Sequence, residues 1–284
     1  MKINTQTQLC GLLGNPVEHS LSPAIHNAAF EHLGLNFVYL AFPVEDVEGA
    51  IMGIKALGNL RGFSVTIPHK VAVMSYLDDI ELTARHIGSV NTIVKENGKL
   101  TGYNTDASGA LLALRQAGVM LGQNKVMILG SGGAARAIAF AIAVEDAVRE
   151  LTILGIDEKE RNSLVQDIRE KTSVEVQQGA ISDETLGENL PHTDVLIHCT
   201  PIGMHPKIGE SCVPQHLLNP SLTVMDIVYN PLETRLLREA REKGCTVIRG
   251  VEMFVNQAVG QFERWTGHPA PLKVMRAVLE ARFQ

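Results

Sequence analysis

The chain has 284 residues, a formal net charge of −6, 45% hydrophobic residues, 25 glycines and 12 prolines. This length predicts one large or two medium-sized domains, and the composition excludes collagen-like and low-complexity proteins. No apolar run reaches the roughly 18–20 residues of a membrane span, the N-terminus lacks a signal-peptide core, and no basic cluster indicates a nucleic-acid surface. We therefore expect a cytoplasmic protein that binds a small molecule, with neither nucleic acid nor a membrane as partner. The sequence leaves a homodimer open.

Apolar runs of strand length alternate with helix-period segments along most of the chain, which is typical of an α/β protein. In the first part, Ser22-Pro23 predicts the start of a helix and Gly34 its end. Asn97-Gly98 predicts a hairpin with a type I′ turn. Strands are expected at 9–14, 37–44, 63–67, 89–94 and 99–102. We infer that this part has too few strands to belong to the sheet of the second part.

A second α/β pattern follows a helix predicted over 107–118. Its strands are expected at 125–129, 151–154, 174–177, 194–199, 223–228 and 246–248. Helices predicted over 251–265 and 271–283 are expected to return to the first part. The chain is thus predicted to be a two-domain α/β protein with a cleft between its domains. Residues 1–106 plus 251–284 would form a smaller substrate-binding domain, and 107–250 a Rossmann-type dinucleotide-binding domain.

The motif Gly130-x-Gly132-x-x-Ala135 follows a predicted strand and opens a predicted helix. In this context it fits the dinucleotide fingerprint, with a tight turn at Gly130 and close backbone approach at Gly132. The free N–H groups of the following helix would face the pyrophosphate. We expect an NAD(P) site here, and a merely structural glycine turn is the alternative.

Ser20 and Ser22 lie at the start of the first predicted helix. Two hydroxyls beside free N–H groups and the positive end of a helix suit an anion such as a carboxylate. The alternative is that Ser22 simply caps the helix. Ser20 is expected to have no capping role.

Lys70 is predicted in the first turn of a helix, after a strand that ends in Ser64-Val65-Thr66. A lysine there opposes the helix dipole, which indicates a residue retained as an acid or base, although a solvated surface lysine remains the alternative. Asp106 follows the hairpin and is either functional or an N-cap. Asn91 lies inside a strand-like run, where a buried amide needs a partner that a polyhydroxylated ligand would supply.

Taken together, these motifs resemble the shikimate dehydrogenase family, including its quinate/shikimate branch, along essentially the whole chain. The matching blocks are GNPVEHSLSPAIHN at 14–27, SVTIPHK at 64–70, SVNT at 89–92, GYNTD at 102–106, GSGGAARA at 130–137, CTPIGM at 199–204, DIVYNPLETRLL at 226–237 and GVEMFVNQAVGQFERWTG at 250–267. The resemblance implies reversible NADP-linked reduction of 3-dehydroshikimate to shikimate, in the chorismate route to aromatic amino acids.

The resemblance also implies residue roles. Lys70 and Asp106 would be the catalytic pair, and Ser20 and Ser22 would hold the substrate carboxylate. The remaining substrate-binding residues would be Thr66, Asn91, Tyr229 and Gln257. Together with the fingerprint, the expected cofactor-binding residues are Gly130, Ser131, Gly132, Gly133, Ala134, Asp157, Thr200 and Gly250. No metal is expected.

The cofactor loop departs from the family pattern. The NADP branch usually places an Asn-Arg-Ser/Thr triplet after its second nucleotide-domain strand, and here Gly155-Ile156-Asp157 stands there. The arginine that would pair with the 2′-phosphate is replaced by Ile156, and Asp157 adds a carboxylate. This favours NAD over the family's NADP, although Arg161 on the following helix could still reach a phosphate.

Two alternatives to shikimate dehydrogenase activity stay open at this point. One is a quinate/shikimate dehydrogenase of broader scope that uses NAD. The other is a non-catalytic protein that senses NAD(P) or a hydroxy acid. In such a protein the presence of both Lys70 and Asp106 would have no functional explanation.

Overall fold

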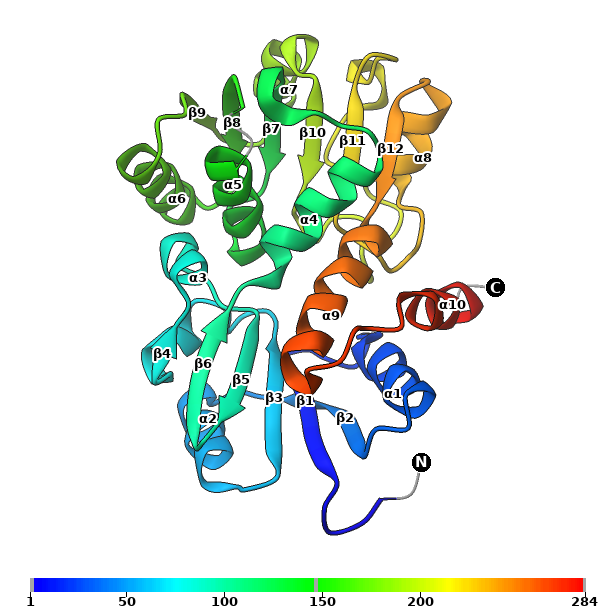
Figure 1. Cartoon of the computed structure of the whole chain (residues 1–284). Helices are drawn as coiled ribbons and strands as arrows, with labels where there is room; N and C mark the ends of the chain where they lie inside the picture. The colour runs from blue at the N-terminus through cyan, green and yellow to red at the C-terminus, as the bar shows by residue number, and fades with distance from the viewer. Residues whose placement is uncertain (1–2, 146–147, 283–284) are drawn as a thin grey trace. The chain divides into compact units, whose positions relative to one another are not determined.

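The computed structural model describes residues 3–145 and 148–282. It divides into two compact units, one made of Met1–Thr105 with Gln257–Gln284 and the other of Asp106–Asn256. The second division falls inside helix α9 (Gly250–Thr266), six residues later than the expected boundary at 250/251. Each unit contains a six-stranded sheet, so the chain is an α/β protein as predicted (Figure 1).

The sheet of the first unit has the strand order β2-β1-β3-β5-β6-β4. Its strands are β1 (Gln8–Gly14), β2 (Phe37–Pro43), β3 (Leu60–Val65), β4 (Asp79–Ile80), β5 (Thr92–Glu96) and β6 (Lys99–Tyr103). β1 is parallel to β2 and β3, whereas β5 is antiparallel to β3 and β6. The first part forms a sheet of its own, as inferred, but the reason given is wrong: it is not poor in strands, because the two-residue β4 and the hairpin complete a sheet as large as the second one.

The β5–β6 hairpin has the predicted turn. Asn97 and Gly98 have φ values of 52° and 79°, and positive φ at both central residues defines the type I′ turn. Its twist matches that of the flanking strands.

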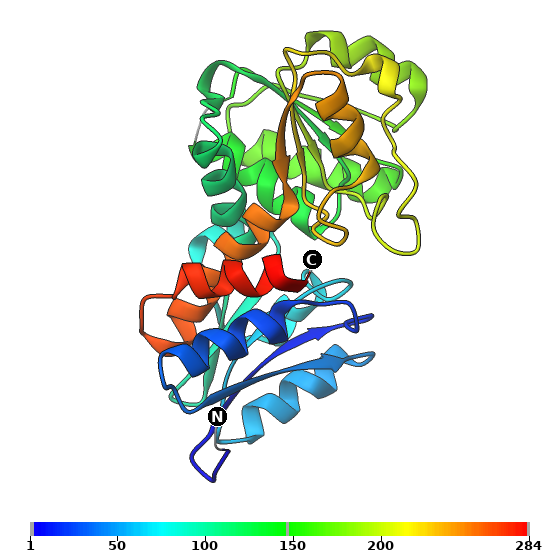
Figure 2. The same ribbon diagram turned by 90° about the vertical axis from the view of Figure 1, so that its right-hand side faces the viewer.

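The helices of the first unit include the chain's C-terminal segment. They are α1 (Ser22–His32), α2 (Val47–Ala56), α3 (Leu82–Ile87), the later part of α9 and α10 (Leu272–Arg282). Figure 2 shows α10 (red) lying along α1 (blue), in agreement with their contacts. Trp265 of α9 is fully buried, and its indole N–H donates to the Ile93 carbonyl at 3.0 Å. The closing helices therefore return to the first sheet, as expected.

The second unit is a parallel sheet with the strand order β12-β11-β10-β7-β8-β9. Its strands are β7 (Lys125–Leu129), β8 (Glu150–Leu154), β9 (Val176–Gly179), β10 (Val195–His198), β11 (Thr223–Asp226) and β12 (Thr246–Arg249). Its helices are α4 (Thr105–Gln116), α5 (Gly133–Glu145), α6 (Glu158–Lys171), α7 (Asp183–Asn189) and α8 (Arg235–Glu242). The strand order reverses between β7 and β10, which is the Rossmann arrangement with its ligand-binding switch point.

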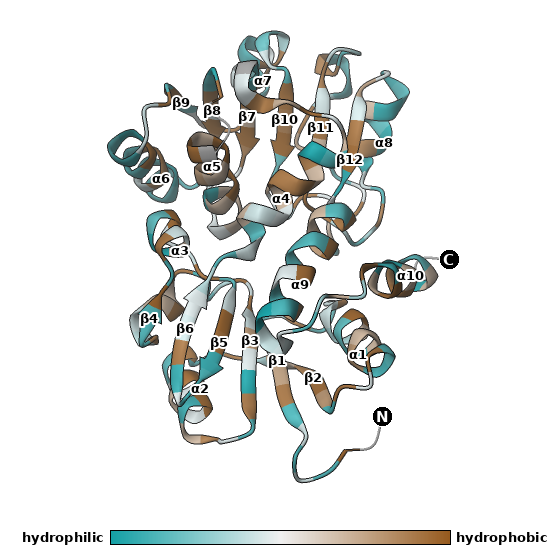
Figure 3. Cartoon of the chain, in the orientation of Figure 1, coloured by the Kyte–Doolittle hydropathy of each residue, from teal (hydrophilic) through white to brown (hydrophobic). Residues whose placement is uncertain are grey.

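Hydropathy follows the layers of each unit. Figure 3 shows apolar residues concentrated on the strands, whereas α6 is mostly hydrophilic and buries only the stripe of Leu164, Val165 and Ile168. Short 3-10 helices lie at Ala72–Tyr76, Leu121–Gln123, Leu190–His192 and Gln215–Leu217. Within the part of the chain that the structure describes, no helix combines the length and apolarity needed to cross a membrane.

Candidate active site

Two loops meet at one edge of the first sheet. β1 and β3 are parallel neighbours, so their carboxyl ends lie at the same edge. A Cβ atom on Gly14 would lie 2.2 Å from Cγ2 of Thr66, so the two chains approach closely only because residue 14 is glycine. The Asn15 amide donates to the Ile67 carbonyl at 2.9 Å. The segments that follow β1 and β3 are thereby tied together.

Ser20 and Ser22 lie where this first loop enters α1. Ser22 is the first residue of the helix and is buried, and Leu21 occupies the N-cap position without a side-chain hydrogen bond. The Ser22 amide donates to Oγ of Ser20 at 3.2 Å. The idea that Ser22 caps the helix while Ser20 has no such role is therefore wrong. Ser20 accepts from the first free amide because its hydroxyl stands just upstream of the helix.

Lys70 lies in the turn after β3, outside any α-helix. The expected helix is a five-residue 3-10 helix that begins at Ala72, so the argument from an opposed helix dipole is wrong. The Lys70 carbonyl accepts from the Val90 amide at 2.8 Å, and the Asn91 carbonyl accepts from the Val65 amide at 2.8 Å. These bonds hold the Lys70 turn against the segment that enters β5.

Asn91 directly precedes β5 and is buried. Its Oδ1 accepts from the Thr105 amide and from the Thr92 hydroxyl, both at 2.7 Å, and its Nδ2 donates to Oγ1 of Thr105 at 3.0 Å. The amide therefore has partners within the protein itself, where the sequence pointed to a ligand. The reason is that β5 and β6 are antiparallel, which brings the residues before β5 opposite those after β6.

A side chain of α9 that no sequence motif singles out, Gln261, supports this edge. Oε1 of Gln261 accepts from the Ser64 hydroxyl at 2.9 Å, and its Nε2 donates to Oγ1 of Thr92 at 3.1 Å. Oγ of Ser64 in turn accepts from the Tyr39 hydroxyl at 2.7 Å. Gln257, one helical turn before Gln261, is also buried. The four-residue spacing of the two glutamines places them on one face of a helix, and this spacing is the sequence signal that could have indicated Gln261.

Asp106 is the second residue of α4 and directly follows Thr105. Its side chain is buried. An N-cap residue precedes the first helical residue, so the N-cap alternative for Asp106 is wrong. A carboxylate in the first turn is stabilised by the positive end of the helix.

In the second unit, β7 ends in the predicted glycine turn. Gly130 has a φ of 115°, and a Cβ atom on it would lie 3.1 Å from the Cys199 backbone. Among the described atoms, none lies within 4 Å of the Cβ position of Gly132, so a ligand can approach this backbone. Ala135 is buried at the third fingerprint position, where the helix packs closely on the strand. This turn, which opens α5, fits a dinucleotide pyrophosphate.

The loop after β8 carries the residues that distinguish this chain from the family pattern. Ile156 is 87% exposed. Asp157 is exposed and is the N-cap of α6, because its carboxylate accepts from a first-turn amide at 2.9 Å. Arg161 turns back toward the strand, and its Nη1 donates to the Gly155 carbonyl at 2.6 Å. A Cβ atom on Gly155 would lie 3.0 Å from Oγ of Ser131, so the glycine turn and this loop are close neighbours.

Thr200, Tyr229 and Gly250 follow three neighbouring parallel strands, β10, β11 and β12, and so stand at one edge of the second sheet. The Tyr229 ring stacks on Phe254 with a centroid distance of 4.1 Å. A Cβ atom on Gly250 would lie 2.4 Å from the Val228 carbonyl oxygen, so backbone packing alone requires a glycine there.

The predicted residues therefore gather at two sheet edges. Ser20, Ser22, Thr66, Lys70 and Asn91 stand at the edge of the first sheet, and Gly130, Thr200, Tyr229 and Gly250 at the edge of the second. Across residues 3–145 and 148–282, no group of three or more His, Cys, Asp or Glu side chains is placed to hold a metal ion.

The fold and these edges define a class, the nicotinamide-dinucleotide-linked dehydrogenases built from two α/β units. Comparison with known proteins narrows it. A family model described as "Shikimate dehydrogenase substrate binding domain" matches residues 12–93, and one described as "Shikimate 5'-dehydrogenase C-terminal domain" matches residues 250–280. The shikimate dehydrogenase (NADP(+)) of Methanopyrus kandleri is 45% identical over 99% of this chain and 98% of its own.

Solved structures agree with this assignment. A shikimate dehydrogenase in complex with NADP+ has a TM-score of 0.92 at 41% identity and covers 100% of this chain and 98% of its own. The shikimate 5-dehydrogenase of Listeria monocytogenes, in complex with shikimate and NAD, has a TM-score of 0.89 at 38% identity and covers 98% of both chains. The chain belongs to the shikimate dehydrogenase family of oxidoreductases.

Proposed function

We propose that this chain catalyses the reversible, dinucleotide-linked interconversion of 3-dehydroshikimate and shikimate on the route to aromatic amino acids. The observation that carries the proposal is the polar edge of the first sheet. There the close approach of Gly14 fixes Thr66, and Thr105 fixes Asn91. An edge with hydroxyl, amide and ammonium groups suits a small polyhydroxylated acid. Membership of the family supports the choice of substrate.

The unit of Met1–Thr105 with Gln257–Gln284 is the substrate-binding unit in this proposal. Ser20 and Ser22 bind the carboxylate, which is supported by their place at the N-terminus of α1. Thr66, Asn91 and Gln257 bind ring hydroxyls, and Tyr229 is a further substrate-binding residue. Because Asn91 Oδ1 already accepts from Thr105 and Thr92, its contribution to the substrate comes from Nδ2, which has two hydrogens and donates one of them to Oγ1 of Thr105.

Lys70 and Asp106 are the catalytic pair of the proposal. When the C3 ketone is reduced, an ammonium at Lys70 donates a proton to the developing alkoxide, and in the reverse direction Lys70 takes the proton back. Asp106 orients Lys70 and the neighbouring hydroxyl. The backbone bond between Lys70 and Val90 supports this role, because it holds the turn that carries the lysine.

The second unit binds the cofactor in this proposal. Gly130, Ser131, Gly132, Gly133 and Ala134 hold the pyrophosphate, which is supported by the open backbone at Gly132. Thr200 and Gly250 stand on the nicotinamide side. The nicotinamide, when bound, supplies the hydride, and the protein supplies orientation and the proton.

We further propose that NAD is preferred over NADP. The curated relative from Methanopyrus kandleri is named as an NADP(+) enzyme, so this would be a departure. It is supported by Ile156, which presents an exposed apolar side chain where the family has an arginine. The Asp157 carboxylate beside it repels a 2′-phosphate. Arg161 is the opposing cation, and its Nη1 already donates to the Gly155 carbonyl.

The cofactor proposal is tested by kcat/KM with NAD and NADP. We expect at least a tenfold preference for NAD, equivalent to about 1.4 kcal/mol. Asp157→Ser removes the charge but keeps an N-cap side chain, so it is expected to narrow the preference without destabilising α6. Arg161→Ala should leave the ratio unchanged. A tenfold preference for NADP would refute the proposal. If Arg161→Ala then abolished that preference, the 2′-phosphate would be assigned to Arg161.

The activity is tested by following dinucleotide reduction with shikimate and quinate side by side. We expect turnover of shikimate and a lower kcat/KM for quinate, which carries an extra hydroxyl at C1. Equal or better use of quinate would reassign the chain to the quinate/shikimate branch. Absence of turnover with both acids, despite dinucleotide binding, would support a non-catalytic sensor instead.

A further inference from the structure

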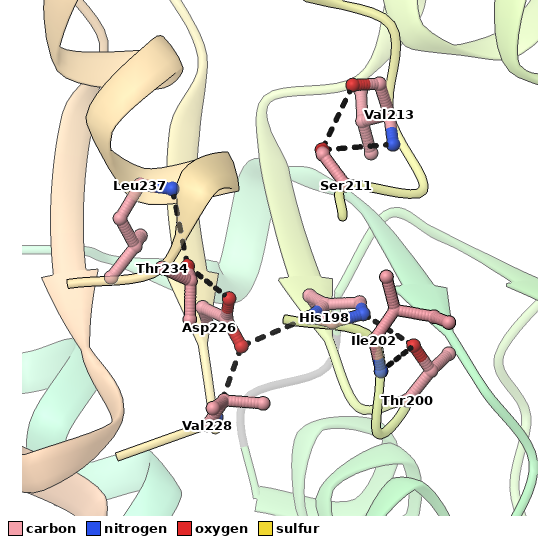
Figure 4. A network of polar contacts seen from close by, with 9 residues as sticks. All are labelled: His198, Thr200, Ile202, Ser211, Val213, Asp226, Val228, Thr234 and Leu237. Atoms are coloured by element: carbon pink, nitrogen blue, oxygen red, sulfur yellow. Dashed lines mark hydrogen bonds and ion pairs between the residues drawn. The ribbon is translucent and has the colours of Figure 1, made fainter. Parts of the chain in front are cut away.

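A buried polar cluster closes the carboxyl ends of β10 and β11 in the second unit (Figure 4). His198 and Asp226 are the last residues of these strands and are partners in the parallel register. Nδ1 of His198 lies 2.9 Å from Oδ1 of Asp226, and its Nε2 lies 2.5 Å from Oγ1 of Thr200. His198 and Asp226 are 1% and 0% exposed. The proton chemistry proposed above uses neither residue.

Asp226 accepts hydrogen bonds on both of its carboxylate oxygens. Its Oδ1 accepts from the Val228 amide at 3.0 Å, and its Oδ2 accepts from the Thr234 hydroxyl at 2.6 Å. Oγ1 of Thr234 accepts in turn from the Leu237 amide at 3.3 Å, which caps α8. A buried carboxylate requires a nearby cation, and His198 is the cation in contact with it.

His198 carries that positive charge at neutral pH. Burial lowers the pKa of His198, but its interactions with Asp226 and, to a lesser extent, with Cys212 outweigh burial and raise it to about 10. Both ring nitrogens of an imidazolium donate, so Nε2 donates to Thr200. Oγ1 of Thr200 also accepts from the Ile202 amide at 3.3 Å. With both of its acceptor positions occupied, the Thr200 hydroxyl retains its proton for a further acceptor.

Thr200 stands at the switch point of the Rossmann sheet. β10 and β7 are neighbours, and the backbone of Cys199, one residue before Thr200, packs against Gly130 of the fingerprint turn. In this fold the fingerprint half binds the adenosine part of the dinucleotide, and the half that starts with β10 takes the nicotinamide part. The acceptor that suits the Thr200 proton is therefore an oxygen of the nicotinamide nucleotide.

We propose that His198 is a positioning residue for the cofactor: it donates to Asp226 and to Thr200, and so directs the Thr200 hydroxyl proton toward the nicotinamide nucleotide. This inference rests on the proposed dinucleotide binding. If a neutral side chain at position 198 accepted a hydrogen bond from Thr200, the Thr200 hydroxyl proton would point toward residue 198 and away from the cofactor. The cofactor would then lose a donor although Thr200 itself remained.

The test compares binding of the whole dinucleotide, NAD or NADP, with binding of ADP-ribose, which lacks the nicotinamide, by titration calorimetry. His198→Asn keeps an amide close to the position of Nδ1, for Asp226, but cannot reach Thr200. We expect His198→Asn and Thr200→Val each to weaken dinucleotide binding by about three- to tenfold and to change ADP-ribose binding less than twofold. The double variant should lose no more than either single variant. Thr200→Ser should recover most of the affinity.

The outcomes separate the inference from the function on which it rests. Additive losses in the double variant, equal losses for ADP-ribose, or full dinucleotide affinity in Thr200→Val would overturn the role of His198. If His198→Asn fails to fold, the inference is still overturned when Thr200→Val retains full dinucleotide affinity. His192→Asn, at an exposed histidine of the same unit, is the matched control and should retain wild-type affinities. A wild-type chain that binds no dinucleotide would refute the proposed function together with the inference.

Discussion

Gly14 at the end of β1 and Thr66 after β3 approach so closely that a Cβ atom on Gly14 would lie 2.2 Å from Cγ2 of Thr66. We expect Gly14→Ala to destabilise the chain by about 1–3 kcal/mol, because the added methyl group must displace Thr66 or the backbone. It should also raise KM for shikimate, since Thr66 is displaced. Gly53→Ala in α2 is the control: nothing described lies within 4 Å of its Cβ position, so it should stabilise by roughly 0.5–1 kcal/mol. Equal stability of both variants in denaturant unfolding would contradict the close approach.

Ser20→Ala and Ser22→Ala test the carboxylate assignment. Each is expected to weaken shikimate binding by about 1–3 kcal/mol, the cost of a lost charge-assisted hydrogen bond. Both substitutions should leave nearly unchanged the affinity for a shikimate analogue whose carboxylate is replaced by an amide. Ser20→Ala should in addition cost some stability, because Ser20 accepts from the Ser22 amide. Equal losses for shikimate and the amide would mean that the serines do not bind the carboxylate.

His26 makes the first unit sensitive to acid. Its ring is fully buried and stacks on Tyr39 at 4.7 Å, and burial lowers the pKa of His26 to about 3, although the neighbouring Gln261 acts in the opposite direction. The unfolded chain takes up this proton near pH 6.5, whereas the folded chain resists it until about pH 3. The contribution of neutral His26 to the free energy of unfolding is therefore complete above pH 6.5. It is lost as the pH falls toward 3, at up to about 1.4 kcal/mol per pH unit.

The measurement is the free energy of unfolding against pH for the wild type and His26→Leu, which cannot titrate. We expect the difference between the two to change between pH 6.5 and 3 and to stay constant above pH 7. A constant difference over the whole range would show that His26 is not responsible.

Local signals in the sequence predicted those parts of the fold that short motifs determine. Asn97-Gly98 predicted its hairpin because only a type I′ turn suits two residues of positive φ. The glycine turn at Gly130 and the closing helices were predicted for similar reasons. The two-residue strand Asp79–Ile80 has no periodicity to detect, and α3 after it is capped by Glu81, an uncommon N-cap residue.

The candidate site was predicted less completely, because its geometry depends on contacts between distant segments. Ser64 and Gln261 are 197 residues apart in the chain, so no local pattern relates them. The 3-10 helix after Lys70 was expected as an α-helix, since both begin with similar residues. The sequence does not indicate Thr105 as the partner of Asn91, because only the antiparallel pairing of β5 and β6 places Thr105 beside it.

Asp106→Asn tests whether the first-turn carboxylate of α4 is functional. Because Asp106 is not an N-cap, the substitution is expected to lower kcat about 10²-fold or more while the midpoint of thermal unfolding changes little. Asp183→Asn, an exposed aspartate in the first turn of α7, is the control for the helix-dipole contribution. A fall in the unfolding midpoint with nearly unchanged kcat would make Asp106 a structural residue.

The most direct test of the central claim, that the edge of the first sheet carries the proton chemistry of a shikimate dehydrogenase, is kcat for shikimate oxidation by Lys70→Ala. We predict a loss of about 10²–10⁴-fold, with dinucleotide binding and unfolding free energy close to wild type, because Lys70 lies in a turn outside any α-helix. Lys273→Ala, at an exposed lysine of the same unit, should retain wild-type kcat. A kcat for Lys70→Ala within a few-fold of wild type would contradict the claim.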